Sequence, residues 1–193
     1  GAALGWPFAA RAQQPIKQHR VGVVTLGDAV AKSFEAELRE GLRQSGLIEG
    51  QNLQYESRAA DGNIALLPKI AAELVVLKVD VIVASGGVPV AQAAQGATKT
   101  IPIIMTGPAD PVATGLVASL ARPGGHITGL AIISHELVGK ELELLREVVP
   151  KVSRVAVLWN PTNPGNTLQL RGAEAAAQVL GVRLQPLEAR DPG

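Results

Sequence analysis

Cysteine is absent from this 193-residue chain, and aromatic residues make up only 3% of it. Without cysteine the chain can form neither disulfide bonds nor thiolate metal sites, and it has no cysteine nucleophile. With so few aromatic residues, a core must be built from alanine, valine, leucine and isoleucine, as in doubly wound α/β folds. The 18 basic and 17 acidic residues give a net charge of +1 and form no basic cluster, which argues against nucleic acids and anionic membrane surfaces as partners.

Catalytic and cofactor-binding signatures are also missing. The first strand-to-helix turn, residues 25–29, holds a single glycine and not the G-x-G-x-x-G pattern of dinucleotide-binding sites. Neither a Walker A motif nor the G-x-S-x-G motif of hydrolases occurs. The three histidines, His19, His126 and His135, lack the spacing of a metal site and are expected to be solvated. We therefore expect no cofactor, no metal and no enzymatic activity.

Short apolar segments alternate with helical patterns, which predicts an α/β fold with a parallel sheet and right-handed crossovers. The expected strands are residues 20–26, 53–58, 81–84, 101–105, 126–133, 155–159 and 182–187. The expected helices are residues 31–45, 67–77, 88–97, 111–120 and 137–149, and a last helix that runs from the turn at 160–164 to residue 180. The final strand–helix–strand unit is either the last piece of one sheet or the first piece of a second lobe.

The chain is organised around residues 80–112, where two successive strands each end in a glycine-bearing loop. Ser85-Gly86-Gly87 follow the first of these strands, and residues 106–111 follow the second. The carboxyl ends of parallel strands meet at one edge of a sheet, where ligands bind to free backbone N–H groups and helix N-termini. We therefore expect a small molecule to be held at this edge.

The residues of these loops allow two interpretations. Ser85, Gly86 and Gly87 either bind a carboxylate or phosphate through backbone N–H groups and the serine hydroxyl, or form a tight turn that needs positive φ. Asp110 is expected to cap the helix that Pro111 opens, and it can also accept a hydrogen bond from a ligand amine.

Two further places are candidates for ligand contact. Thr106 is expected to point into the same cleft as the glycine loops. Trp159 and Asn160 end the first strand of the last unit and would face the first lobe across a cleft if a second lobe exists. A tryptophan is more often a packing residue, so both roles stay open for Trp159.

The first twelve residues are small and apolar, contain no acidic residue and end in Ala10-Arg11-Ala12, the A-x-A pattern of signal-peptidase cleavage. We expect them to be the remnant of a cleaved secretory signal; the alternative is a disordered N-terminal extension. Their apolar part is well short of the ~20 residues of a transmembrane helix.

A series of segments, taken together, resembles a known family. After the signal-like A-A-R-A-Q-Q (9–14) come G-L-I-E-G-Q-N (46–52), S-G-G-V-P (85–89), T-I-P-I (100–103), D-P-V (110–112), G-L-V-A-S-L-A-R-P-G-G-H-I-T-G (115–129), L-E-L-L-R-E-V-V-P (142–150) and N-P-T-N-P (160–164). In this order they look like the periplasmic substrate-binding proteins of ABC transporters, in the branch that resembles tryptophan/tyrosine-type binders. The resemblance covers essentially the whole chain.

The resemblance implies a periplasmic-binding-protein-like fold of type I, a doubly wound parallel-sheet lobe plus a second α/β lobe that closes on it about a hinge. The implied parts are a signal remnant (1–12), a first lobe (13–133), a connecting helix near the hinge (134–153) and the start of a truncated second lobe (154–193). Ser134 and His135 fall near the first crossover between lobes. Family members continue past this point, so the chain is expected to be a fragment.

By position, the resemblance implies ligand contacts from three loops of the first lobe and one of the second. The loops are residues 26–29, 85–88 and 106–110 of the first lobe and 159–163 of the second. The candidate contacts within them are Leu26, Gly27, Asp28, Ser85, Gly86, Gly87, Val88, Thr106, Gly107, Asp110, Trp159 and Asn160. The implied partners are a small-molecule solute and, at the membrane, an ABC permease with its ATPase.

The leading hypothesis is a soluble periplasmic binder without catalysis, the solute-binding component of an ABC importer. An amino acid or related carboxylate is the first candidate, because turn N–H groups suit a carboxylate and Asp110 suits an ammonium group. One alternative is the ligand-sensing domain of a regulator or receptor built on the same fold. Another is an α/β enzyme with an unrecognised site.

Overall fold

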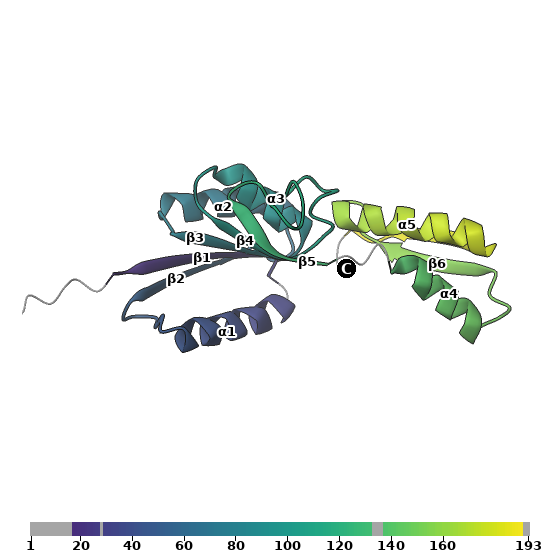
Figure 1. Ribbon diagram of the computed structural model, residues 1–193, viewed down its shortest axis with the longest axis horizontal. Helices are drawn as coiled ribbons and strands as arrows, with labels where there is room; N and C mark the ends of the chain where they lie inside the picture. The colour runs from purple at the N-terminus through teal and green to yellow at the C-terminus, as the bar shows by residue number, and fades with distance from the viewer. Residues whose placement is uncertain (1–16, 28, 133–136, 191–193) are drawn as a thin grey trace, which may run out of the picture.

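The computed structural model describes residues 17–27, 29–132 and 137–190, and within them the chain forms two parallel sheets (Figure 1). One sheet has the strand order β2-β1-β3-β4-β5, and the other consists of β6 and β7. The strands are β1 (His19–Thr25), β2 (Leu53–Ala59), β3 (Val81–Ser85), β4 (Ile103–Ala109), β5 (Ile127–Ile132), β6 (Arg154–Trp159) and β7 (Arg183–Glu188). The helices are α1 (Ala29–Gln44), α2 (Leu67–Val76), α3 (Val88–Ala97), α4 (Val138–Val148) and α5 (Pro164–Leu180), with a 3-10 turn η1 (Ile64–Leu66) before α2. The predicted α/β class with parallel strands is confirmed.

The five-stranded sheet is doubly wound about β1, because β1 lies between β2 and β3. Helix α1 covers one face of this sheet, and α2 and α3 cover the other (Figure 1). On the α1 face, Val23 and Val83 pack with Phe34 and Leu38. The direction of winding reverses between β1 and β3, and ligands of open α/β sheets bind at the carboxyl edge beside such a reversal.

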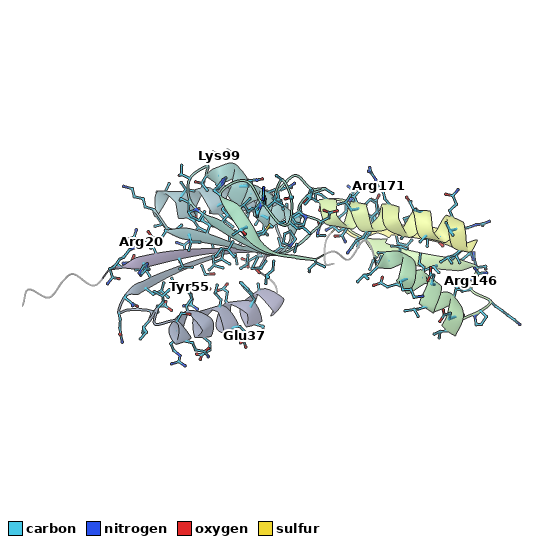
Figure 2. The ribbon with its side chains drawn as sticks, viewed as in Figure 1. Arg20, Glu37, Tyr55, Lys99, Arg146 and Arg171 are labelled. Carbon is cyan, nitrogen blue, oxygen red and sulfur yellow. The ribbon has the colours of Figure 1, made fainter. Side chains whose placement is uncertain are left out.

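Helix α1 is held across the sheet by the edge strand β2. Tyr55 of β2 is only 9% exposed beneath α1 (Figure 2). The guanidinium carbon of Arg39 lies 3.6 Å from the centre of the Tyr55 ring, and Arg39 also forms an ion pair with Glu49. A cation over an aromatic face is attracted by the ring quadrupole. These contacts orient α1, so that its N-terminus lies at the carboxyl edge of β1.

The two-stranded sheet is separate from the first in the part of the chain that the structure describes. Helices α4 and α5 pack on each other and on one face of this sheet, where Leu142, Ala173 and Ala177 form a small buried cluster. The opposite face holds Leu158 and Leu187, which are in register and 72% and 43% exposed. Of the two alternatives for the last strand–helix–strand unit, a separate sheet agrees with the start of a second lobe. The boundaries predicted at residues 133 and 153 stay predictions.

Residues 111–120 form turns and bends, so the helix predicted there is wrong. Asp110 has a φ of 34°, and the Leu116 N–H donates to the carbonyl of Pro111 over 2.8 Å, which closes a turn too wide for an α-helix. Leu116 and Val117 are nevertheless buried in the core. Their burial explains why the segment carries an apolar pattern like that of a helix face.

Strand β4 starts two residues later than predicted and runs four residues further. Pro102, just before it, has no backbone N–H to donate to a neighbouring strand. Between Thr106 and Ala109 the pairing of β4 with β5 shifts its register. Such a bulge adds a local bend and is common beside binding sites. Thr106 and Gly107, which were predicted to lie in a loop, are therefore part of the irregular end of β4.

The histidines match the expectation only in part. His19 and His126 are half-buried rather than solvated, and Nε2 of His126 has no hydrogen-bond partner among the described residues. His135 and its neighbour Ser134 lie outside the described residues, as do the first twelve residues with their predicted signal.

Candidate ligand-binding site

Three hydroxyl side chains form a row across the carboxyl edge of the five-stranded sheet. Thr25 is in register with Ser85, and Ser85 is in register with Thr106, so the three lie on one face of β1, β3 and β4. Adjacent strands are about 4.8 Å apart, which makes the row roughly 10 Å long. The row lies on the face that α1 covers, beside the N-terminus of that helix.

Thr25 is the member of this row that the sequence analysis missed. It is only 1% exposed, and its Oγ1 has no hydrogen-bond partner in the described part of the chain. A buried hydroxyl left without a partner costs about 1–3 kcal/mol. The only sequence signal for Thr25 was its position at the end of a predicted strand.

A Thr25→Val variant is expected to raise the free energy of unfolding of the ligand-free protein by about 1 kcal/mol, because a methyl group of similar size replaces a buried hydroxyl that lacks a partner. Urea denaturation measures this change. The control is Thr128→Val on β5, where the hydroxyl side chain is exposed and the change should stay within about 0.5 kcal/mol. A clear destabilisation by Thr25→Val would contradict the account, since it would show that the hydroxyl is already bonded.

The two glycines after β3 have different reasons to be glycine. Gly86 has a φ of 126°, and a Cβ there would lie 2.9 Å from Cγ2 of Val90 and 3.2 Å from Cβ of Leu26. Gly87 has a φ of 86°, but the nearest atom to its Cβ would be Cδ of Pro89 at 4.0 Å. Both glycines have the positive φ of the tight-turn interpretation. Gly86 is in addition closely packed, whereas Gly87 leaves its backbone open to the space beyond.

Two helices begin on opposite sides of this space. Helix α3 starts directly after Gly87, which gives it no side-chain cap. Helix α5 starts at Pro164, and Asn163 caps it by accepting a 3.0 Å hydrogen bond from the Gly165 N–H. The first N–H groups of a helix lack partners within the helix and carry a partial positive charge. The two N-termini therefore create a positive potential between the two α/β units.

A cavity of about 140 Å³ lies between these helix ends. It is lined from the first unit by Gly87, Val88, Gly107, Ala109 and Ile132, and from the second by Asn163, Gly165, Asn166 and Gln169. The lining carries no ionisable side chain, so the backbone N–H groups and side-chain amides set its chemistry. Helix N-termini of this kind bind anions such as carboxylates. The volume is below the ~300–1,000 Å³ of typical ligand pockets, so in this conformation the cleft is narrow.

The loop at the end of β4 contributes Gly107 to this cavity and Asp110 behind it. Gly107 has a φ of 70°, and a Cβ there would lie 3.2 Å from Cδ1 of Ile132. Asp110 Oδ1 accepts a 2.9 Å hydrogen bond from the Ala113 N–H. Asp110 therefore has the predicted capping role, although it caps a turn and not a helix.

The first predicted loop is used for packing. Leu26 is half-buried and its carbonyl accepts a 2.8 Å hydrogen bond from the Gly62 N–H. A Cβ on Gly27 would lie 2.8 Å from the backbone nitrogen of Asp61. These contacts hold the loop against the turn after β2. Asp28 lies outside the described residues, so its predicted ligand contact stays a prediction.

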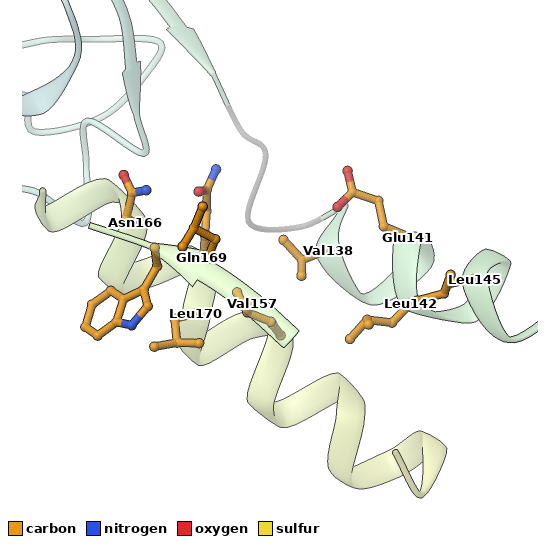
Figure 3. A pocket seen from close by; sticks show the side chains of 11 residues that line it. Val138, Glu141, Leu142, Leu145, Val157, Asn166, Gln169 and Leu170 are labelled. Atoms are coloured by element: carbon orange, nitrogen blue, oxygen red, sulfur yellow. The ribbon is translucent and has the colours of Figure 1, made fainter. Parts of the chain in front are cut away.

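Trp159 lines a neighbouring cavity of about 310 Å³ among α4, α5 and the end of β6, which shares Asn166 and Gln169 with the 140 Å³ cavity. Figure 3 shows Val138 and Leu142 of α4 across this cavity from Val157 and Leu170. The indole N–H of Trp159 is buried without a partner among the described residues. The structure thus does not bring Trp159 to the cavity that holds Gly87 and Gly107.

Asn160 shapes the turn before α5. Its Oδ1 accepts hydrogen bonds from the Thr162 N–H at 2.9 Å and the Thr162 hydroxyl at 2.7 Å. The side chains that the second unit offers to the 140 Å³ cavity come instead from Asn163, Asn166 and Gln169. Asn163 ends the loop of residues 159–163 that the family resemblance implies as a ligand contact, and an asparagine before a proline is typical of a helix N-cap followed by the first helical residue.

These features define a two-unit α/β protein that can bind a ligand. It has a doubly wound sheet, a second α/β unit and a cleft between them. The family model of the ABC transporter substrate binding protein matches residues 20–192, so the chain belongs to this family. The family is one of binding proteins and not of enzymes, as predicted. The type I periplasmic-binding-protein-like fold is confirmed by the similarity to solved structures.

Three relatives illustrate the similarity. The chain is 34% identical to the tyrosine-binding protein of Clostridioides difficile (strain R20291) over 159 residues, which cover 80% of this chain and 44% of that protein. A conserved domain protein from Vibrio cholerae has 34% identity and a TM-score of 0.82, over 90% of this chain and 58% of that one. The ABC domain in complex with L-Trp from Streptococcus pneumonia has 23% identity and a TM-score of 0.77, with the same coverage. The chain thus spans about half the length of these relatives.

Proposed function

We propose that this chain is the solute-binding component of an ABC importer and holds an amino acid or a related small carboxylate between its two α/β units. The observation that supports this most directly is the pair of helix N-termini, α3 and α5, that begin on opposite sides of one cavity. A carboxylate between them would lie at the positive ends of two helix dipoles and accept hydrogen bonds from backbone N–H groups at the start of α3. At the start of α5 the N–H groups of Gly165, Asn166 and Thr167 are already bonded to Asn163, so this helix would act through its dipole and its side-chain amides.

The rest of an amino acid would find complementary groups nearby. Thr25, Ser85 and Thr106 offer hydroxyl groups along the same sheet edge. We propose that Asp110, which directly follows the bulge in β4, attracts the ammonium group. The tyrosine-binding relative and the relative solved with L-Trp support an aromatic amino acid as the first ligand to test.

We propose that the protein works outside the cytoplasm and passes its ligand to a membrane permease. The small, apolar first twelve residues with their A-x-A pattern support export through a cleaved signal. No helix in the described ranges is long and apolar enough to cross a membrane. The family match supports a permease and its ATPase as the partners.

A thermal-unfolding panel tests the proposal. The protein is melted with each L-amino acid and with representative dipeptides, purines and sugars at millimolar concentration. A ligand at about 100 times its dissociation constant adds about 2.7 kcal/mol of stability and should raise the midpoint by a few degrees. The matched control for each hit is its carboxamide, which keeps the side chain and the ammonium group but lacks the carboxylate.

We expect a shift with at least one L-amino acid and none with its carboxamide. Equal shifts with both forms would contradict carboxylate recognition. A cooperative melt without any shift, or shifts only with sugars or purines, would contradict the amino-acid proposal and favour another ligand class or a sensing role.

A further inference from the structure

We infer that Gly165 sets how closely the two α/β units approach, because its missing side chain lets the N-terminus of α5 reach the end of β4. Gly165 is buried, and a Cβ there would lie 2.8 Å from Cβ of Ala109 and 3.6 Å from Cγ2 of Val88. Non-bonded carbon atoms pack at about 3.5–4.0 Å. A single added methyl group would therefore push the two units apart by about 1 Å.

The local backbone conformation does not require a glycine at position 165. Gly165 is the second residue of α5, and it is not one of the described residues whose φ is positive. Any residue can adopt this helical backbone, and glycine is the poorer helix former. The shortest contact of an added Cβ would be with Ala109, which belongs to the other unit; the next, with Oδ1 of Asn163 in its own turn, is longer at 3.3 Å.

The position also cannot shift easily to make room. Pro164 fixes the backbone just before Gly165, and Asn163 holds the Gly165 N–H through its capping hydrogen bond. Ala109 in turn is at the end of β4, where it pairs with Ile132 of β5. The added volume would therefore be relieved by movement between the units rather than within either one.

The inference deepens the proposed function and rests on it for its effect on ligand affinity, because Gly165 also lines the 140 Å³ cavity. Its effect on the spacing of the units needs no ligand. A measurement without ligand therefore distinguishes a residue that sets the spacing of the two units from one that only contacts the ligand.

The spacing is measured directly by pulsed electron paramagnetic resonance in the ligand-free full chain. The chain has no cysteine, so Lys99→Cys and Arg171→Cys provide one exposed spin-label position on each unit (Figure 2). Gly165→Ala and Gly165→Val are compared with the parent double-cysteine protein. The control is Gly139→Ala in α4, where the added Cβ would make an ordinary 3.6 Å contact with Cβ of Ala176.

The mean label distance is expected to change by about 1 Å with alanine at 165 and by more with valine, and to stay constant in the Gly139→Ala control. Adding Ala109→Gly to Gly165→Ala should restore the parent distance, because it removes the atom that the new Cβ meets. Affinity for L-tryptophan should fall about tenfold in Gly165→Ala and recover in the double variant.

A label distance that Gly165→Ala and Gly165→Val leave unchanged overturns the inference, whether or not L-tryptophan binds. A changed distance that Ala109→Gly does not restore also overturns it, since the steric contact would then not be the cause. If the distance responds as expected and L-tryptophan does not bind, the inference stands and the choice of ligand fails.

Discussion

A Gly87→Val variant is expected to lose at least about a hundredfold in ligand affinity, which corresponds to about 2.7 kcal/mol. The Gly87 backbone faces open space at the start of α3, and a valine side chain would occupy the approach to the N–H groups that we propose bind the carboxylate. The variant should also lose about 1–3 kcal/mol of stability, because the φ of 86° and ψ of −163° lie in a region that is essentially restricted to glycine. Calorimetric titration measures the affinity and urea denaturation the stability.

The matched control for this prediction is Gly46→Val. Gly46 has nearly the same φ, 82°, and a Cβ there would meet no atom of the described residues within 4 Å. It follows α1 at the opposite end of that helix from the cleft. Both variants should be destabilised, and only Gly87→Val should lose affinity. Equal affinity in the two variants would remove Gly87 from the proposed site.

A Gly129→Ala variant is expected to lose about 3 kcal/mol or more of unfolding free energy. Gly129 in β5 has a φ of 144°, and a Cβ there would overlap the backbone oxygen of Met105 and lie 2.8 Å from its backbone nitrogen. These are backbone atoms of the neighbouring strand β4, so the strain can be relieved only by parting the two strands. Urea denaturation measures the loss.

The control is Gly125→Ala, just before the same strand. A Cβ at Gly125 would have no described atom within 4 Å, and the change in unfolding free energy should stay within about 0.5 kcal/mol. A Gly129→Ala protein as stable as this control would mean that β4 and β5 do not approach each other as the structure has them.

The fold was predictable from the sequence where local signals and packing agree. Helix α3 has the predicted bounds, because Gly87 ends the preceding turn and the alanine-rich segment has no competing pattern. Residues 111–120 misled because Leu116 and Val117 are buried by the tertiary structure and not by a helix face. Burial in an irregular turn leaves the same apolar pattern in a sequence as burial on a helix.

The candidate site was predictable at the loops that follow its strands. Gly87 and Gly107 stand out in the sequence because turns at strand ends need such residues. The row of Thr25, Ser85 and Thr106 depends on strand register, which a single strand does not reveal. Whether Trp159 faces the cleft depends on how β6 is oriented relative to its helices, which the sequence does not reveal. In the structure the Trp159 side chain lines the 310 Å³ cavity beside α4.

The most direct test of the central claim is an NMR titration of the ¹⁵N-labelled chain with L-tryptophan or L-tyrosine, whichever gives the larger thermal shift. We expect the amide signals of Ser85, Gly87 and Gly107 in the first unit, and of Asn163 and Gly165 in the second, to move together along one saturation curve. Changes confined to Val157, Leu170 and their neighbours would locate the ligand in the 310 Å³ cavity instead. That result, or a spectrum that does not change, would contradict a ligand held between the two units.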